Sequence, residues 1–286
     1  MASVTIKLIL KNGNAQSLRV AEISNWNGIA LATPRTELSG ISTLKESKHA
    51  GVYLLTGTNT ELDKPKAYIG EAEEVGKRLN QQLVKEFWVQ AIAFVSRDDT
   101  LTKSHFKYLE GRLIEEAKKV GRFDLENDVM SGAKLPESDR DDMEGFLDRV
   151  RQLLPVLGCD LLVPAVQHVK SNRGLICKIK GLTAHGQRSA KGFVVFKGSQ
   201  AAGELRNSAK TRGGWIIKIR NRLLDSKVLV AESEHLTFAH DYEFDSPSAA
   251  AAIVRGGNAN GLTEWKSAEG KTLKELDASI FEQFEA

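Results

Sequence analysis

The 286-residue sequence has little of what disulfide-rich, zinc-binding or membrane-spanning proteins contain. Its two cysteines, Cys159 and Cys177, are too few for a disulfide framework, and no cluster of Cys and His has the spacing of zinc ligands. No apolar run reaches the roughly 18 residues that a transmembrane helix needs, and the N-terminus has no basic stretch followed by an apolar segment. We therefore expect a cytoplasmic protein that does not bind a membrane.

Charge is distributed unevenly along the chain, although the formal net charge is only +3. Residues 166–230 contain 14 Lys and Arg but two acidic residues, a net charge of +12, whereas residues 1–165 carry −2 and residues 231–286 carry −7. Aromatic residues such as Phe193 and Trp215 are interleaved with the basic ones. This pattern is expected of a surface that binds the phosphate backbone of nucleic acid, and a solvated strand face is the alternative.

Gly, Pro and polar residues divide the chain into three predicted parts. Residues 1–45 are a β-rich extension, because apolar and polar residues alternate from Val4 to Lys11 and residues 11–14 supply a hairpin turn. Residues 46–160 form a compact domain. Its predicted elements are strands at 50–56, 66–70 and 91–95, helices at about 73–86 and 103–119, and a helix that starts near Ser138 and ends at Pro155 and Gly158.

Residues 161–286 are predicted to form a strand-rich C-terminal domain with one short helix. That helix is marked by Ser246 as its N-cap, Pro247 at its first position and Gly256 as its stop. Short strands are expected near residues 193–196, 215–219, 227–230 and 237–238.

Two Gly/Tyr triplets stand at the ends of neighbouring apolar runs, Gly51-Val52-Tyr53 and Tyr68-Ile69-Gly70. A triplet of this kind is common by itself, since a buried Tyr is usually a core residue with a satisfied hydroxyl. The residues that follow make the pattern specific: Arg78, Gln82, Glu110 and Asn127, in that order. The whole set resembles the signature of the GIY-YIG endonucleases. The resemblance implies an α+β nuclease domain in which a three-stranded antiparallel sheet is flanked by helices.

Glu110 has an unusual position on its predicted helix. Its spacing from Phe106, Leu113 and Ile114 puts it on or beside the apolar stripe, and an inward-facing carboxylate is costly unless its charge is compensated. A structural salt bridge is one means of compensation. The resemblance to the GIY-YIG family implies another, since this glutamate binds a single Mg²⁺ or Mn²⁺ there, and one carboxylate with phosphate and water ligands suits Mg²⁺.

The two tyrosines and Arg78 can be given chemical roles. A free phenol has a pKa of about 10, so a Tyr that acts as a general base needs a cation that stabilises its phenolate. Arg78 suits this task, or it holds the scissile phosphate. We expect Tyr53 to deprotonate water, Tyr68 and Arg78 to steady the phosphate, and Glu110 to converge with them on one concave surface of the sheet.

Four further residues complete the predicted site. Gln82 departs from the family, in which many members carry a histidine at this place, and an amide can only orient or hydrogen-bond. His105 is interpreted as a helix-start residue, with a substrate contact as the alternative. Asn127 occupies the place of the family's late asparagine, which helps to order the active site, and a turn residue is the alternative. Gly70 is expected to allow close approach of backbone or phosphate.

The resemblance extends along most of the chain, to a bacterial subgroup with an N-terminal strand extension and a C-terminal domain of unknown function. It rests on residues 67–73, Phe87-Trp88, 135–137, 146–147, 244–251 and 260–266. In the basic segment, Lys218, Arg220 and Arg222 are the expected phosphate contacts.

The expected function is a metal-dependent endonuclease that hydrolyses phosphodiester bonds in nucleic acid, with DNA as the favoured substrate, in restriction, phage defence or repair. The alternatives are a nucleic-acid-binding protein with a weak or inactive site, for which Gln82 is the only support, and an RNA nuclease subunit of a defence complex. A second copy of the chain or a subunit of such a complex is the expected protein partner.

Overall fold

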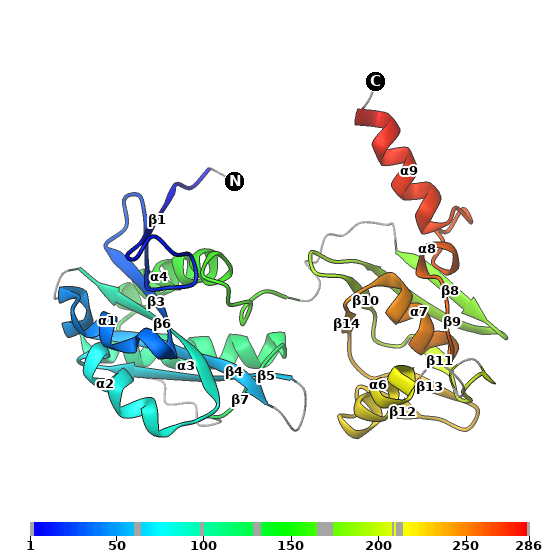
Figure 1. Ribbon diagram of the computed structural model, residues 1–286, viewed down its shortest axis with the longest axis horizontal. Helices are drawn as coiled ribbons and strands as arrows, with labels where there is room; N and C mark the ends of the chain where they lie inside the picture. Colours follow the sequence, from blue (N-terminus) through cyan, green and yellow to red (C-terminus); the bar gives the residue numbers. More distant parts are fainter. Residues whose placement is uncertain are drawn as a thin grey trace. The chain divides into compact units, whose positions relative to one another are not determined.

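The computed structural model describes residues 3–59, 64–97, 100–127, 133–164, 174–207, 209 and 214–284. The chain forms two compact units, Met1–Pro164 and Ala165–Ala286. Both mix helices with sheets, so the predicted α+β class is confirmed (Figure 1).

The first unit is built on one seven-stranded sheet in the order β1-β2-β3-β6-β4-β5-β7. Its strands are β1 (Ile6–Leu10), β2 (Arg19–Ile23), β3 (Gly28–Pro34), β4 (Gly51–Asn59), β5 (Lys64–Ala72), β6 (Trp88–Ser96) and β7 (Asp124–Leu125). Neighbours are antiparallel except for β5 and β7, which are parallel. The sheet therefore has seven strands, where the family resemblance implied three. The three predicted strands, β6, β4 and β5, are neighbours within the seven-stranded sheet. Strand β3 pairs with β6 along Gly28–Pro34, which joins the N-terminal extension to the same sheet.

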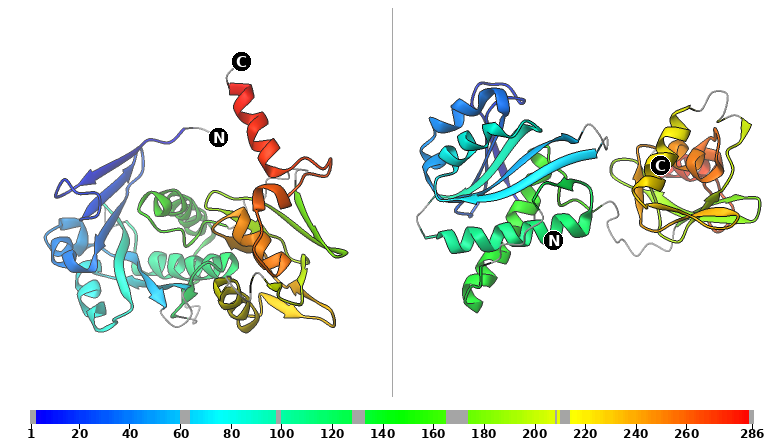
Figure 2. Two further views of the ribbon diagram at one scale, coloured as in Figure 1. Left: turned by 45° about the vertical axis from the view of Figure 1, so that its right-hand side comes forward. Right: turned by 90° about the horizontal axis from the view of Figure 1, so that it is seen from below.

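Helices cover both faces of this sheet (Figure 2, right). One face carries α1 (Leu38–Ser42), α2 (Val75–Gln81) and the short 3₁₀ turns η1 (Arg35–Glu37), η2 (Lys45–Lys48) and η3 (Gln82–Val84). The other face carries α3 (Lys103–Val120) and α4 (Glu137–Val156). Because consecutive residues of a strand point to opposite faces, Tyr53 and Leu55 pack with α2, whereas Val52 and Leu54 pack with α3 and α4.

The second unit contains two antiparallel sheets and four described helices (Figure 1). One sheet, in the order β14-β10-β9-β8, comprises β8 (Leu175–Ile179), β9 (Leu182–Arg188), β10 (Phe193–Val195) and β14 (Tyr242–Phe244). The other, in the order β11-β13-β12, comprises β11 (Gln200–Ala202), β12 (Leu229–Ala231) and β13 (His235–Phe238). The helices are α6 (Gly214–Asp225), α7 (Pro247–Arg255), α8 (Gly261–Glu264) and α9 (Leu273–Phe284). Phe193 and Trp265, with ring centroids 4.4 Å apart, lie in its core.

Local signals located α2, α3, α4 and α7, but α1, α6, α8 and α9 were not predicted, so the second unit has more than the one short helix that was expected. In α7 the Ser246 hydroxyl accepts a hydrogen bond from the Ala249 N–H at 3.1 Å, Pro247 takes the first helical position, and Gly256 ends the helix with φ of +66°. Two further predictions need correction, one of a strand and one of a helix end. The region 215–219 belongs to helix α6 and not to a strand. The helix expected to reach residue 86 ends at Gln81, and the 3₁₀ turn η3 follows it. Leu83 in this turn is exposed and does not belong to the core.

Within the described residues, no helix is both long and apolar enough to cross a membrane.

Candidate functional site

The two Gly/Tyr triplets lie side by side on the adjacent strands β4 and β5. In the antiparallel pairing of β4 with β5, Tyr53 is opposite Gly70 and Tyr68 is opposite Leu55. The tyrosine rings share the α2 face, with centroids 6.1 Å apart. A Cβ at residue 70 would lie 2.6 Å from Cζ and Oη of Tyr53. The Tyr53 phenol thus occupies the space that we expected Gly70 to leave for backbone or phosphate.

Gly51 has a comparable packing role at the start of β4. A Cβ there would lie 2.5 Å from the Phe94 carbonyl oxygen and 2.7 Å from Cγ2 of Val75. Val75 is the first residue of α2, so the absence of a side chain at Gly51 lets this helix pack closely on the sheet. The same helix carries Arg78 towards Tyr53.

Tyr53 is fully buried and its hydroxyl oxygen accepts hydrogen bonds from two directions. Nε2 of Gln82, itself buried, donates at 2.9 Å, and the Arg78 guanidinium also hydrogen-bonds to Tyr53. Burial raises the pKa of the Tyr53 phenol well above its ordinary value, and the neighbouring Tyr68 raises it further. The raised pKa favours the neutral phenol near pH 7, and the general-base role of Tyr53 stays a prediction. Tyr68 lies beside it, with ring centroids 6.1 Å apart, and is a further polar neighbour of its hydroxyl.

Tyr68 is only half-buried and lies beneath a lysine. Nζ of Lys85 is 4.7 Å from the centroid of its ring, and the same ammonium pairs with the Glu126 carboxylate. Lys66 binds the other oxygen of Glu126 at 3.0 Å. Tyr68 thus lies beside a charged cluster formed by Lys85, Glu126 and Lys66. Lys85 was not found from the sequence, because a single Lys in a polar segment carries no distinctive pattern.

Asn127 holds the second triplet in place. Its side-chain oxygen accepts from the Ile69 N–H at 3.1 Å, and its Nδ2 donates to the Ile69 carbonyl oxygen at 2.6 Å. The Glu126 N–H donates to the carbonyl oxygen of Ala67, two residues before Ile69 on β5. The Asn127 amide thus continues the parallel pairing of β7 onto β5, between Tyr68 and Gly70. The ordering role implied by the family resemblance agrees with these contacts.

Replacing Asn127 by Ala is expected to lower the free energy of unfolding by about 1–3 kcal/mol, because the buried Ile69 N–H and C=O lose their partners. Denaturant unfolding measures this change, and hydrogen exchange should show a less protected Ile69 amide. Asn127→Asp retains only the acceptor for the Ile69 N–H and should also destabilise. Unchanged stability and unchanged exchange in both variants would show that these two bonds do not hold β5.

Glu110 lies on α3, which packs on the opposite face of the sheet from the tyrosines. Its side chain is half-buried beside the buried Phe106, Leu113 and Ile114, as its helical phase predicts. The four predicted catalytic groups therefore do not all belong to one face. Tyr53, Tyr68 and Arg78 share the α2 face, and Glu110 belongs to the α3 face.

The two faces are linked electrostatically at the carboxyl end of β5. The pKa of Arg78 on α2 is raised mainly by Tyr53 and to a smaller extent by Glu71, which follows the Tyr-Ile-Gly triplet. The pKa of Lys103 at the start of α3 is raised mainly by Glu73, with a smaller contribution from the same Glu71. Lys103 pairs with Glu73 at 3.0 Å. One Glu71 oxygen is buried without a hydrogen-bond partner among the described residues. Sequence reasoning missed Glu71, although its position directly after Gly70 could have drawn attention to it.

A divalent cation suits the donors at this end of β5. An unpartnered buried carboxylate oxygen favours a nearby positive charge, and Mg²⁺ is often held by one or two carboxylates with water and phosphate. No group of three or more His, Cys, Asp or Glu side chains in the described part of the chain is placed to hold a metal ion. The buried Glu71 oxygen is the feature of this strand end that suits a cation, and Glu110 as a metal ligand stays a prediction.

His105 is part of the start of α3. Its Nδ1 accepts from the Thr102 N–H at 2.9 Å and completes a capping box with Thr102, and its Nε2 lies 3.4 Å from Oδ2 of Asp139. The interpretation as a helix-start residue agrees with these contacts. A substrate contact through His105 stays a prediction.

The raised pKa of Tyr53 leads to a prediction about stability. A phenol whose pKa is raised in the folded state stabilises the protein below the unfolded pKa of about 10, and this contribution is lost as the pH rises further. We expect the free energy of unfolding to fall more steeply above this pH in the wild type than in Tyr53→Phe. Denaturant unfolding at several alkaline pH values measures both slopes, with Tyr242→Phe as the control. Equal slopes in all three proteins would contradict the assignment.

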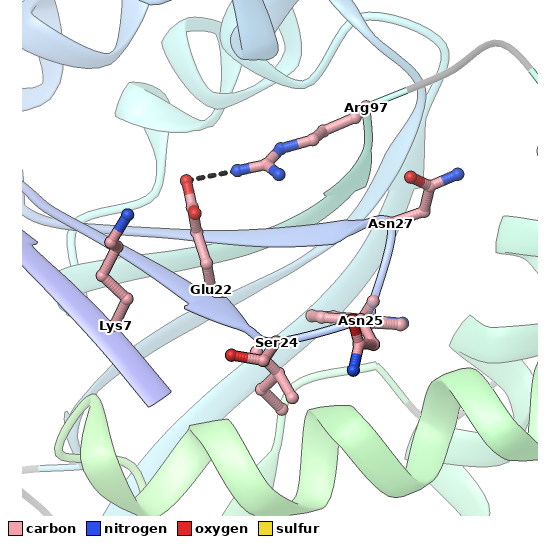
Figure 3. Close-up of a pocket in the computed structure, with 8 residues that line it drawn as sticks. Lys7, Glu22, Ser24, Asn25, Asn27 and Arg97 are labelled. Carbon is pink, nitrogen blue, oxygen red and sulfur yellow. Dashed lines mark ion pairs between the residues drawn. The ribbon is translucent and has the colours of Figure 1, made fainter. Parts of the chain in front are cut away.

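A surface pocket of about 560 Å³ lies elsewhere on the first unit (Figure 3). It is lined by Lys7, Glu22, Ile23, Ser24, Asn25, Trp26, Asn27 and Arg97, and an ion pair joins Arg97 to Glu22. None of the predicted site residues lines it.

The three predicted phosphate contacts of the second unit have different environments on α6. Lys218 is exposed, and Arg222 is half-buried with Nη2 donating to the Tyr242 hydroxyl at 3.2 Å. Arg220 is only 3% exposed, and its guanidinium donates to the carbonyl oxygens of Ala202 and Gly203. Arg220 therefore has a structural role, and its prediction as a phosphate contact was wrong. Four other basic residues of the 166–230 segment, Lys170, Arg173, Lys210 and Arg212, lie outside the described residues.

Comparison with known proteins gives one match, in the second unit. Residues 175–277 match a family described as a domain of unknown function, DUF4357. The match runs from β8 into α9 and covers a little over a third of the chain. No curated protein and no solved structure matches the chain significantly.

Proposed function

We propose that the chain is a metal-dependent endonuclease of the GIY-YIG type that hydrolyses phosphodiester bonds, with DNA as its expected substrate. The observation that carries the proposal is the arrangement around the paired triplets. Two tyrosines share one face of the adjacent strands β4 and β5, Arg78 and Gln82 hydrogen-bond to the inner one, and Asn127 holds β5 at Ile69, next to Tyr68.

The exposed position of Arg78 allows it to bind substrate. It lies on α2, where Nη1 donates to Oε1 of Gln81 at 3.0 Å while the guanidinium also reaches Tyr53. A guanidinium has more donors than these contacts use, and its planar fork matches two oxygens of one phosphate. Arg78 would thus hold the scissile phosphate beside Tyr68 and offset the charge that develops on it.

Tyr68, once it has released its own proton to solvent, would accept the proton of the attacking water. The water oxygen forms a bond to phosphorus, the bond from phosphorus to the leaving 3′ oxygen breaks, and that oxygen takes a proton from solvent. Tyr53 would keep its own proton and donate it as a hydrogen bond to the Tyr68 oxygen, while the Lys85 ammonium lies over the Tyr68 ring. Gln82 fixes the direction of that bond, and for this task an amide serves in place of an ionisable histidine.

Glu110, with Glu71 at the end of β5, would hold the Mg²⁺ or Mn²⁺. When bound, a divalent cation stabilises the charge of the phosphoryl oxygens and of the leaving group.

The experiment that tests the proposal is a cleavage assay. The purified protein is incubated with end-labelled single- and double-stranded DNA and RNA, in Mg²⁺, Mn²⁺ or excess EDTA. We expect internal cleavage of DNA that requires the metal. Absence of cleavage on every substrate would favour the nucleic-acid-binding alternative, for which the buried and neutral Tyr53 is a specific observation. Cleavage of RNA alone would favour the RNA nuclease alternative.

The second unit would contribute affinity for nucleic acid through Lys218 and Arg222. In the double variant Lys218→Ala/Arg222→Ala, we expect weaker binding to DNA of any sequence, because phosphate contacts carry no base information. The slope of log affinity against log salt should become shallower by roughly 2, since each phosphate contact contributes about 0.9. Fluorescence anisotropy at several salt concentrations measures both quantities.

The matched control is Arg188→Ala, because Asp277 already neutralises the charge of Arg188 on the same unit. An unchanged slope in the double variant would assign α6 to another role. Arg220→Ala should instead destabilise the second unit, since Arg220 is buried.

A further inference from the structure

Strand β1 is an edge of the seven-stranded sheet and shows apolar side chains to solvent. It pairs with β2 on one side, and no strand among the described residues pairs with its other side (Figure 1). Val4, Leu8 and Ile9 are 42%, 40% and 36% exposed. An open edge strand with exposed apolar residues is a template for pairing with another strand.

The hydrogen-bonding phase of β1 determines which residues face the open edge. The Ser24 N–H donates to the Thr5 carbonyl oxygen, and the Lys11 N–H donates to the Leu18 carbonyl oxygen. Odd-numbered residues of β1 therefore bond to β2. Because bonded and non-bonded pairs alternate along an antiparallel ladder, the N–H and C=O groups of Ile6, Leu8 and Leu10 point outward.

We propose that two copies of the chain associate through antiparallel pairing of β1 with β1 about a twofold axis at Leu8. This pairing joins the outward backbone groups of Leu8 with those of Leu8 in the second copy, and those of Ile6 with those of Leu10. It requires no metal and no nucleic acid, so it does not depend on the proposed nuclease activity.

Charge selects this register over its neighbours. With the axis at Leu8, Lys7 faces Ile9 of the second copy. A twofold axis at Lys7 would place Lys7 opposite Lys7, and one at Ile9 would place Lys7 opposite Lys11, and like charges directly opposite are destabilising. Within its own chain, Lys7 lies beside Glu22, its partner on β2, and Figure 3 shows both side chains on one side of the hairpin.

The association is a reversible, concentration-dependent dimer. A pairing of one short strand with its copy buries less than the roughly 1,200–2,000 Å² of a stable interface. Obligate dimerisation is therefore not expected, and sedimentation velocity over a wide concentration range is the suitable measurement.

The register is tested by cysteine cross-linking of the full chain. Residues 7 and 9 of opposite copies form a non-hydrogen-bonded pair, whose Cα separation of about 4.5 Å permits a disulfide. Mixing Lys7→Cys protein with Ile9→Cys protein under mild oxidation should give a cross-linked dimer much faster than either variant alone. The wild type serves as one control, because Cys159 and Cys177 are buried, and Val84→Cys, at a site 85% exposed on η3, is the other. Faster cross-linking of either single variant would overturn the register, and rates equal to that of Val84→Cys would overturn the pairing.

The surface is tested by Leu8→Lys, which places like charges against each other at the axis. Because the backbone groups of Leu8 face away from β2, the fold should remain intact by circular dichroism. We expect the wild type and the control Val84→Lys to dimerise with rising concentration and Leu8→Lys to stay monomeric. A wild type that is monomeric throughout, or a Leu8→Lys variant that dimerises equally, would overturn the proposal.

Discussion

Glu110→Gln is expected to lower the rate of DNA cleavage by at least about 10³-fold, because a bound metal contributes several kcal/mol and each 1.4 kcal/mol is about a factor of ten. Glutamine retains the size of the side chain and removes the charge that a cation requires. Binding to DNA and the free energy of unfolding should change little. Single-turnover cleavage in Mg²⁺, binding in the absence of metal, and denaturant unfolding measure the three quantities.

The matched control for Glu110 is Glu115→Gln on the same helix. Glu115 pairs with Arg112 and Lys119 at the surface of α3, and surface pairs contribute little to stability. This variant should cleave at nearly the wild-type rate. Full activity of Glu110→Gln, or cleavage by the wild type in excess EDTA, would remove Glu110 and the metal from the mechanism.

Tyr68→Phe is expected to lower the cleavage rate by roughly 10²–10⁴-fold, the range that a general base contributes. Tyr53→Phe should lower it by about fivefold, because it removes only one hydrogen bond to the Tyr68 oxygen, worth about 1 kcal/mol. The comparison is informative since the rings are neighbours with centroids 6.1 Å apart, but only Tyr53 is fully buried. Single-turnover rates of both variants at saturating DNA give the ratio.

The reverse order of effects would assign proton transfer to Tyr53, the role expected from the sequence, despite its raised pKa. Equal and small effects would remove both hydroxyls from the chemistry. Binding affinity serves as the control measurement, because each substitution keeps the aromatic ring and removes only one hydroxyl.

Local patterns in the sequence predicted those elements that local interactions determine. The helix at 247–255 has its cap, its first-position proline and its terminal glycine within a dozen residues, so no distant contact is needed to define it. The apolar spacing of α3 likewise placed Glu110 beside its buried stripe. The order of Tyr53, Tyr68, Arg78 and Asn127 indicated residues that the structure brings together around β5.

The predicted strand at 215–219 was wrong, because its residue types favour a strand but its buried residues follow helical spacing. Residues 215–219 contain three isoleucines, which favour a strand, yet they form α6 with Ile216, Arg220 and Leu223 buried at helical spacing. A buried arginine interrupts the apolar pattern that marks a helix. The burial of Arg220 depends on the carbonyl groups of Ala202, at the end of β11, and of Gly203, directly after it.

The sequence by itself determined the α+β class and the positions of α2, α3, α4 and α7, because these follow from local spacing and capping, while the family resemblance pointed to Tyr53, Tyr68, Arg78 and Asn127. Only the tertiary structure decided that the N-terminal extension joins the central sheet, that α3 lies on the face opposite the tyrosines, and that Tyr53 is buried while Tyr68 reaches the surface. Strand partners, the choice of face and the depth of burial depend on contacts between residues far apart in the chain, and alternation within a strand specifies two faces without specifying what covers each of them.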